Sequence, residues 1–322
     1  MRRRNVIKGL VVGLALLGGS TAFAHDKIIV SGASGQLGSL VIEELLARGV
    51  ASANLILVSR TPNTEHLSSY ARRGASVRYG DFTRPDSLEA AYEGGTRMLL
   101  ISINGGGDRP ELHKRAIDAA ARAGVKHIAH TSYVNADRYL SSTIAVDHRR
   151  TERFLEESGV AWTMLRNHLY ANGLVDQAVA IVSDGRFVTH TPDARVAYVT
   201  REDCAAAAAA VLATPGHENK AYNITGPDAI GPRELVALAS EISGKRVELV
   251  ALSEAAYRQQ LATSGMTAAA INGTISFAAE LDSPFLREPS TAVADLTGRR
   301  ATSVRMLLTA ERDRLRAAAG AR

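Results

Sequence analysis

The chain has 322 residues, of which 46% are hydrophobic and 22% charged, a composition typical of a globular protein and unlike that of a disordered one. Its formal net charge of +5 comes almost entirely from Arg2, Arg3, Arg4 and Lys8. The rest of the chain is nearly neutral and has no long run of lysine and arginine, so the sequence argues against nucleic-acid binding.

The first 24 residues follow the order of a secretory signal. A basic segment over residues 2–8 precedes the uncharged apolar run 9–19, and Ala22-Phe23-Ala24 forms a cleavage site of small residues. Arg3-Arg4 with the aliphatic residues and lysine that follow resembles the twin-arginine export signal. We therefore expect residues 1–24 to be removed on export to the periplasm, with the general secretion route as the alternative.

The apolar run of this leader is short for a membrane anchor. Eleven residues span about 16 Å as a helix, whereas the hydrocarbon core of a bilayer is roughly 30 Å thick. No stable membrane span is therefore expected after cleavage; an uncleaved leader would leave the protein anchored or cytoplasmic. The single cysteine, Cys204, cannot form an internal disulfide, so an oxidising compartment would add no covalent crosslink.

From residue 27 onward, short apolar runs alternate with helical patterns. Runs rich in valine, isoleucine and leucine, each bounded by a helical pattern, are typical of a parallel sheet covered on both faces. This alternation predicts a Rossmann-type doubly wound α/β fold. The expected strands are 27–31, 54–59, 76–80, 98–102, 127–132 and 162–166, and the expected helices are 42–48, 66–73, 87–94, 112–124 and 151–159.

The alternation fades after Asn172. A helix over 201–212, a strand and turn over 220–227 and a helix over 233–244 are expected there, and the remainder is helical and irregular. We therefore predict an NAD(P)-binding Rossmann core over residues 25–170. Residues 171–322 are expected to form a smaller, mostly helical substrate lobe that completes the fold.

A glycine-rich turn directly follows the first expected strand and opens the first helix. It consists of Gly32, Ala33, Ser34, Gly35, Gln36, Leu37 and Gly38. The first glycine permits a sharp turn, the second lets the backbone approach a pyrophosphate, and the third lets the helix lie close to the strand. Because a helix N-terminus presents free N–H groups and partial positive charge, this turn predicts dinucleotide binding.

The end of the second strand indicates which dinucleotide binds. An acidic residue there would bond the ribose hydroxyls of NAD, but the sequence is Val58-Ser59-Arg60-Thr61. Arg60 can pair with a 2′-phosphate, so NADP(H) is favoured over NAD(H). The alternative is that Arg60 is a solvated surface cation.

The spacing G-x-x-G-x-x-G resembles that of extended and atypical short-chain dehydrogenases/reductases. Carbonyl-reducing members of that superfamily use a Tyr-x-x-x-Lys pair as proton donor. At the corresponding positions this chain has Ile144 and His148, and neither Tyr133 nor Tyr139 has a lysine four residues later. A sugar-nucleotide epimerase or dehydratase mechanism is therefore disfavoured.

Segments along almost the whole mature chain resemble the NmrA-like family, most closely its NAD(P)H:quinone oxidoreductase members. They include GASGQLGSLVIEELLARG, HKRAIDAAARAGVKHIAHTS and TREDCAAAAAAVL, in that order. The resemblance implies NADPH in the Rossmann cleft and a quinone or similar planar acceptor beside the nicotinamide. Those proteins also lack the tyrosine–lysine pair and have a histidine at the position of His148.

Carried over by position, the resemblance assigns further residues. The turn from Gly32 to Gly38 would hold the pyrophosphate and Arg60 the 2′-phosphate, and His148 would face the nicotinamide ribose. The residues after strands three, four and five would line the cofactor, and those after strand six would border the acceptor. They are Asp81, Phe82, Ser102, Ile103, Asn104, Thr131, Ser132, Tyr133, Asn167, His168 and Tyr170, of which Ser132 and Asn167 are expected, with His148, at the catalytic centre.

Structural alternatives accompany several of these assignments. Thr131 and Ser132 could serve only to satisfy backbone groups, His148 could be a surface residue of its helix, and Gly105-Gly106-Gly107 could be a lid or a plain loop. Asp137, His148 and Glu152 do not form a recognisable set of metal ligands, so no metal site is expected. The sequence leaves a homodimer open.

The expected chemistry is direct hydride transfer from C4 of NADPH to a bound quinone. Reduced quinone oxygens acquire protons readily, so the protein would contribute orientation and water exclusion more than acid catalysis. The rival hypothesis is an NADP(H)-binding redox sensor that performs no chemistry. Export raises the question of how NADPH reaches the protein outside the cytoplasm. Either the cofactor travels with the folded chain, or the leader is not cleaved.

Overall fold

The computed structural model describes residues 26–103, 107–138 and 142–320. The leader, the predicted cofactor residue Asn104, and Gly105 and Gly106 of the glycine run lie outside the described residues.

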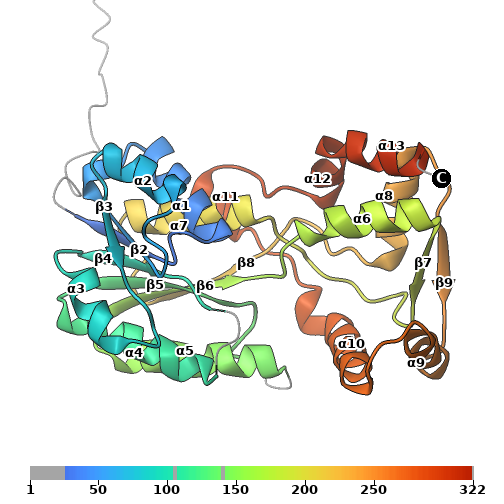
Figure 1. Ribbon diagram of the computed structural model, residues 1–322, viewed down its shortest axis with the longest axis horizontal. Helices are drawn as coiled ribbons and strands as arrows, with labels where there is room; N and C mark the ends of the chain where they lie inside the picture. The colour runs from blue at the N-terminus through green and yellow to red at the C-terminus, as the bar shows by residue number, and fades with distance from the viewer. Residues whose placement is uncertain (1–25, 104–106, 139–141, 321–322) are drawn as a thin grey trace, which may run out of the picture.

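Seven parallel strands form one sheet in the order β3-β2-β1-β4-β5-β6-β8 (Figure 1). All six predicted strands are confirmed, with ends within two residues of those expected, and the predicted 220–227 strand joins them as an edge strand beside β6. The strands are β1 (Ile28–Ser31), β2 (Leu55–Ser59), β3 (Ser76–Tyr79), β4 (Arg97–Leu100), β5 (His127–Tyr133), β6 (Ala161–Asn167) and β8 (Lys220–Ile224).

Helices cover both faces of this sheet, as the buried valine, isoleucine and leucine runs require. One face packs against α1 (Gln36–Ala47), α2 (Glu65–Arg72), α7 (Arg201–Ala213) and α11 (Ala292–Thr297). The other packs against α3 (Leu88–Tyr92), α4 (Arg109–Arg122) and α5 (Thr143–Glu157). Short 3₁₀ turns lie at η1 (Ser52–Asn54) and η2 (Pro85–Ser87). The doubly wound fold is confirmed, although α1 and α5 begin six and eight residues before the predicted starts of their helices.

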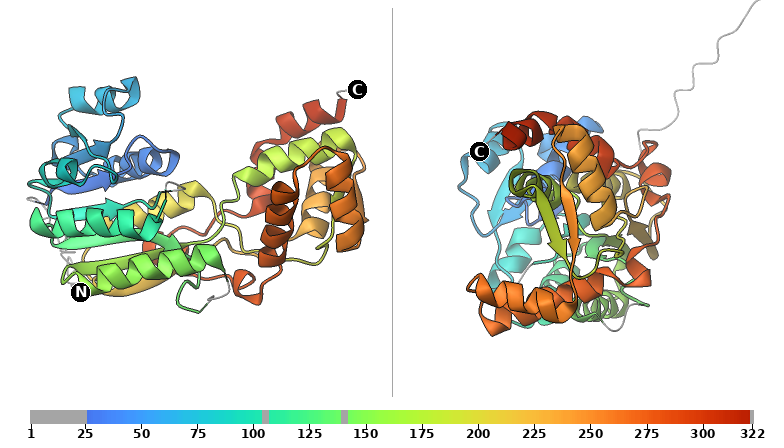
Figure 2. Two further views of the ribbon diagram at one scale, coloured as in Figure 1. Left: turned by 60° about the horizontal axis from the view of Figure 1, so that its bottom comes forward. Right: turned by 90° about the vertical axis from the view of Figure 1, so that its right-hand side faces the viewer.

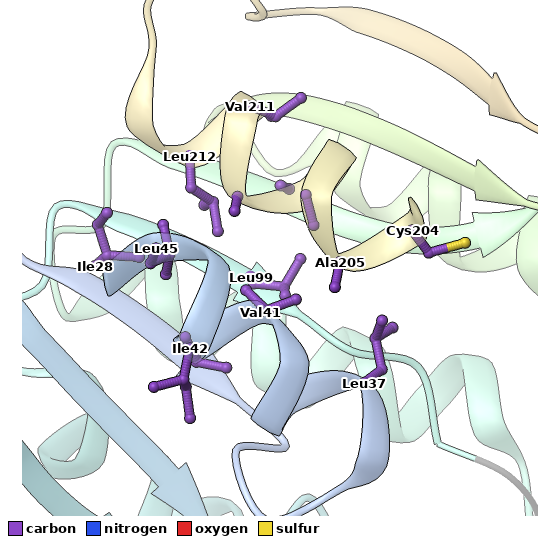
Figure 3. Close-up of a cluster of buried hydrophobic side chains, with 14 of the residues drawn as sticks. Ile28, Leu37, Val41, Ile42, Leu45, Leu99, Cys204, Ala205, Val211 and Leu212 are labelled. Atoms are coloured by element: carbon purple, nitrogen blue, oxygen red, sulfur yellow. The ribbon is translucent and has the colours of Figure 1, made fainter. Parts of the chain in front are cut away.

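Small side chains allow the first face to pack closely. Every residue of α7 from Asp203 to Leu212 is buried, and six of them are consecutive alanines. Figure 3 shows α7 lying along α1, with Leu37, Val41 and Leu45 of α1 directed toward α7. Alanine contributes little apolar area by itself, so here the sequence gains stability from the close approach of two helices and the sheet.

The second half of the molecule is mostly helical (Figure 2). A two-stranded parallel sheet of β7 (Arg186–Thr189) and β9 (Glu248–Ala251) packs beside helices that share a third apolar cluster. The elements of this half are α6 (Gly173–Asp184), α8 (Pro232–Ser243), α9 (Glu254–Thr263), α10 (Ala268–Leu281), η3 (Pro284–Leu286), α12 (Val304–Ala310) and α13 (Arg312–Gly320). No helix in the described ranges is both long and apolar enough to span a bilayer.

The predicted boundary at residue 170 does not separate the two halves in space. After α6 and β7 the chain returns to the sheet half to form α7 and β8, and it returns again for α11. The reason is that β5 pairs with only one edge of β6. The other edge of β6 pairs with β8, which runs parallel to it. The C-terminal segment is therefore partly core and partly lobe.

A substitution at Gly38 can test how closely α1 must approach β1. A Cβ atom at this position would lie 2.3 Å from the carbonyl oxygen of Gly32 and 3.0 Å from the Cα of Ala33. We expect Gly38→Ala to lower the free energy of unfolding by about 1–3 kcal/mol, because backbone would have to shift.

The matched control is Gly173→Ala in the first turn of α6, where an added Cβ meets nothing within 4 Å. This change should alter stability by less than about 1 kcal/mol. Urea unfolding followed by circular dichroism measures both. Equal midpoints for the two variants would contradict the close-approach argument.

Candidate cofactor and acceptor site

The glycine-rich turn has the geometry that the sequence predicts. Gly32 follows β1 with φ +98°, a conformation that glycine adopts without strain. The backbone N–H groups of Gly32 and Ala33 both donate to the carbonyl of Val58, at 3.0 and 3.1 Å, which ties the turn to β2. Gly35 then occupies the N-cap of α1.

The N-terminus of α1 is open to an anion. No side chain caps it, and its first turn contains no acidic residue, so neither the free N–H groups nor the positive end of the helix dipole is neutralised from within. A phosphate at this position would receive hydrogen bonds from the helix backbone. The carboxyl end of β1 is therefore a candidate anion site.

Two of the cavities beside this turn share lining residues. One has a volume of about 310 Å³ and lies over β2 and β3, and the other, of about 450 Å³, lies over β5 and β6. Gly32, Gly35, Ile101 and Ser102 line both. Together the cavities form one cleft along the carboxyl ends of the strands, where open α/β sheets bind ligands.

The smaller cavity has a cluster of hydroxyl groups beside Arg60. The Ser34 and Ser59 hydroxyls are 2.7 Å apart, and the Thr61 backbone N–H donates to Ser59 Oγ at 2.9 Å. Arg60 is exposed and lines the cavity, with no acidic residue paired to it in the described chain. The sequence prediction missed Ser59 and Thr61, although both flank Arg60 and their hydroxyls were a readable signal for a phosphate site.

Asp81 and Phe82 also line the smaller cavity. The Asp81 carboxylate accepts from the backbone N–H and the hydroxyl of Thr83, at 2.9 and 2.8 Å, so it fixes its own turn. Phe82 is buried and contacts the His113 ring edge to face, with ring centroids 6.1 Å apart. Ile103, which completes this wall, donates its backbone N–H to His113 Nε2 at 3.0 Å.

Thr131 and Ser102 bridge the two cavities. Thr131 Oγ1 accepts from the Ser102 backbone N–H at 2.8 Å and donates to Ser102 Oγ at 3.2 Å. The structure therefore gives Thr131 the backbone-satisfying role that the sequence left as an alternative. Ser102 Oγ is left with the capacity to donate toward the cavity that it lines.

Ser132 is held by a buried ion pair that the sequence prediction missed. Its hydroxyl donates to Glu152 Oε1 at 2.7 Å, and Glu152 is fully buried. The same carboxylate accepts from Arg166 at 2.8 and 2.9 Å and from Arg149 at 3.1 Å. Because the Ser132 proton is engaged, the side of this hydroxyl that faces the larger cavity is an acceptor.

His148 lies in the larger cavity with Ile144, the two residues that replace the lysine and the tyrosine of the usual pair. His148 is only 7% exposed, which excludes the surface-helix alternative. Burial, with smaller contributions from His130, Arg109 and His113, holds the pKa of His148 well below its ordinary value. The imidazole is therefore neutral at physiological pH and cannot replace the cation that lowers the pKa of a catalytic tyrosine.

Two further histidines extend from His148 beneath the cleft. The ring centroids of His148 and His130 are 6.1 Å apart, and those of His130 and His113 are 5.5 Å apart. Burial lowers the pKa of His130 to about 4 and that of His113 to about 3. Neutral rings thus lie behind the cleft residues His148 and Ile103, and the sequence prediction identified only one of the three histidines.

The residues after β6 close the larger cavity. His168 accepts from the Leu169 N–H at Nδ1, so Nε2 carries the proton that is donated to the Leu286 carbonyl at 3.1 Å. Tyr170 lies under the Arg201 guanidinium, 4.8 Å from ring centroid to Cζ. Arg201 also lines the cavity, but no motif in the sequence signalled it.

Among the buried polar atoms that make no hydrogen bond within the described residues are Asn167 Oδ1 and His148 Nδ1. Both residues line the larger cavity. Buried polar atoms are almost always hydrogen-bonded, so these two fit a site completed by a ligand with polar groups. The cleft, its anion site and the Arg60 cluster fit a phosphorylated dinucleotide. Within the described ranges, no three His, Cys, Asp or Glu side chains are grouped as metal ligands.

Comparison with known proteins agrees with this geometry. Over 239 residues the chain is 37% identical to quinone oxidoreductase 2 of Escherichia coli strain K12, covering 74% of this chain and 82% of that protein. An E. coli NADPH-dependent quinone oxidoreductase complexed with NADPH has a TM-score of 0.80 at 33% identity, and Citrobacter sp. triphenylmethane reductase complexed with NADP(H) has 0.78 at 32%. Each structural match covers 88% of this chain and 99% of the other.

Residues 32–215 match the family model described as NAD(P)H-binding, which begins at the first glycine of the turn and ends just after α7. The matched span thus contains β2 to β6 and α7, the helix that packs against α1. The chain therefore belongs to the NAD(P)H-binding family of Rossmann-fold proteins, in agreement with the resemblance found in its sequence.

Proposed function

We propose that the protein is an NADPH-dependent oxidoreductase that transfers a hydride to a quinone-like acceptor. The observation that carries the proposal is the cleft formed by the two cavities. The smaller cavity contains Arg60, which suits a phosphate, and the larger is lined by His148 and other rings and by no carboxylate of the described residues. The similarity to a quinone oxidoreductase and to reductases solved with NADP(H) supports it.

In this proposal the turn from Gly32 to Gly38 binds the pyrophosphate, and Arg60 with the Ser34, Ser59 and Thr61 hydroxyls binds the 2′-phosphate. Asp81, Phe82 and Ile103 flank the adenine side. Ser102, Thr131 and Tyr133 line the middle of the cleft. When bound, the dinucleotide supplies the hydride.

The catalytic work assigned to the protein is orientation and exclusion of water. Neutral His148 and the acceptor oxygens of Ser132 and Asn167 are available to hydrogen-bond the nicotinamide side and a hydroxyl of the reduced product. None of them needs to supply a proton in the hydride step, because hydride transfer gives the hydroquinone monoanion, which takes its one remaining proton from water when it leaves the site. The apolar Ile144 and Leu169 side chains face a planar acceptor, and we assign acceptor recognition to this wall and to the C-terminal lobe behind it.

The second candidate is a redox sensor that binds NADP(H) without turnover. The burial of both Ser132 and His148 beside the unpartnered Asn167 Oδ1 favours an enzyme, since a sensor needs no polar groups prepared for an acceptor. The absence of a Tyr-x-x-x-Lys pair disfavours an epimerase. A homodimer stays a prediction.

Turnover with benzoquinone tests the activity. Stopped-flow mixing of the NADPH-loaded protein with benzoquinone should show loss of absorbance at 340 nm, and deuterium at C4 of NADPH should slow a hydride-limited step. His148→Phe should lower kcat by less than about 100-fold, the lower limit for a general acid or base, because no dedicated acid is lost. Tight NADP(H) binding without oxidation by any acceptor would favour the sensor.

Arg60 tests the cofactor preference. Arg60→Ala should weaken NADPH binding by about 10- to 100-fold, as expected for loss of one charge-assisted contact, and leave NADH binding nearly unchanged. The control is Arg300→Ala, an exposed arginine outside both cavities, which should change neither affinity. Fluorescence titration measures the four dissociation constants; equal affinity for both cofactors in the unmodified protein would contradict the assignment.

We further propose that residues 1–24 direct export to the periplasm by the twin-arginine route, supported by Arg3-Arg4 and the small-residue site at Ala22–Ala24. That route carries folded proteins, so the cofactor would cross with the chain. Replacing Arg3-Arg4 by Lys-Lys should retain the protein in the cytoplasm, as cell fractionation would show. An unchanged distribution would refute the route, and an unchanged distribution after deletion of residues 1–24 would refute export itself.

A further inference from the structure

The wall of the larger cavity is held from outside by one short segment of the C-terminal lobe, residues 280–288. This segment joins the end of α10 to η3 and lies against the ends of β5 and β6. None of its side chains lines the cavity. It nevertheless makes hydrogen bonds to two residues that do line the cavity, Tyr133 and His168.

Glu280 makes the first of these contacts. Its Oε1 atom accepts from the Tyr133 hydroxyl at 3.1 Å and from the Ser142 hydroxyl at 2.6 Å. Ser142 is also the N-cap of α5, the helix that carries Ile144 and His148. One carboxylate of the C-terminal lobe therefore fixes both a residue of β5 and the start of the helix that faces it.

Leu286 makes the second contact through its backbone. Its carbonyl accepts from His168 Nε2 at 3.1 Å and from the Ala197 N–H at 2.9 Å. Asn135 Nδ2 donates to the Phe285 carbonyl at 2.7 Å, which ties the same segment to the turn after β5. The segment is thus hydrogen-bonded both to the residues after β5 and to those after β6.

These bonds decide which part of each side chain faces the acceptor. The donor groups of Tyr133 and His168 are engaged by the 280–288 segment, so the two residues add rings to a wall that already contains Ile144 and Leu169. The Tyr133 ring also stacks on His148, with centroids 6.0 Å apart and an interplanar angle of 20°. A planar apolar acceptor suits such a wall, whereas an unengaged phenol would seek a partner such as Asn167 Oδ1 within the cavity.

We propose that Glu280 is a positioning residue for the acceptor: its carboxylate holds the Tyr133 hydroxyl outside the cavity and so keeps the acceptor wall apolar. The inference rests on the proposed function, since it concerns the acceptor half of the same cleft. It assigns a role in acceptor binding to a residue far along the chain that touches neither cofactor nor acceptor.

Glu280→Ala is the principal test. It should raise KM for benzoquinone, and the dissociation constant of benzoquinone from the NADP⁺-loaded protein by calorimetry, by about tenfold, the cost of one unsatisfied buried hydroxyl. The kcat value and the affinity for NADP⁺ should change by less than about twofold, because Glu280 contacts neither the glycine-rich turn nor the Arg60 cluster. Glu280→Gln, which keeps an acceptor oxygen, should remain close to the unmodified protein.

The double variant Glu280→Ala/Tyr133→Phe separates positioning from general loss of structure. Removing the hydroxyl should remove the damage, so the double variant should bind benzoquinone as well as Tyr133→Phe alone. Glu288→Gln is the matched control, since Glu288 belongs to the same segment but pairs with the exposed Arg138. It should change neither KM nor affinity.

The outcomes are distinct. A double variant as impaired as Glu280→Ala, an unchanged KM in Glu280→Ala, or an equal loss of NADP⁺ affinity would each overturn the inference. If the unmodified protein binds benzoquinone but does not oxidise NADPH, the proposed function fails while the calorimetric comparison of the variants still decides the role of Glu280.

Discussion

The structure depends on one close approach, that of α1 to β1 at Gly38, where no Cβ atom fits. Because α1 starts immediately after the turn, this approach places the free N–H groups of its first turn at the edge of the sheet and in the middle of the cleft. The alanine-rich α7 then packs along α1 and fixes its position from the outside (Figure 3). The candidate anion site thus depends on the missing Cβ atom of Gly38 together with the hydrogen bonds from Gly32 and Ala33 to Val58.

Beyond that site, the charged side chains near the cleft are placed so that few of them face it unpaired. The charges near it are paired below the surface, as with Glu152 and Arg166, or placed at its margin, as with Arg201. Burial keeps the histidines beneath it neutral, since the charged imidazolium loses its solvation there. A cleft of this kind has no acid of the tyrosine–lysine type to offer, and it suits an acceptor that needs a hydride and an orientation but no proton in the same step.

What could be predicted from the sequence was local in the chain. The apolar strand runs and the turn from Gly32 to Gly38 depend on residues that are neighbours in the chain, and the structure confirms both. The pairing of β8 with β6, the Glu152 network and the position of Arg201 depend on residues brought together from distant segments, which no periodicity or motif in a single sequence encodes. Thr131 illustrates the intermediate case: its place at the end of β5 was predictable, but its engagement with Ser102 was not.

The same division separates the two halves of the cleft. The cofactor end is formed by consecutive strand ends, so its residues come in chain order and carry recognisable motifs. The wall that we propose for the acceptor is held by Glu280 and Leu286, which lie 147 and 118 residues after their partners Tyr133 and His168. A wall supported in this way can change its shape through substitutions in the lobe while the glycine-rich turn and Arg60 stay as they are. Under the proposed function, differences in acceptor between relatives are therefore expected in the segment behind the wall more than in the glycine-rich turn.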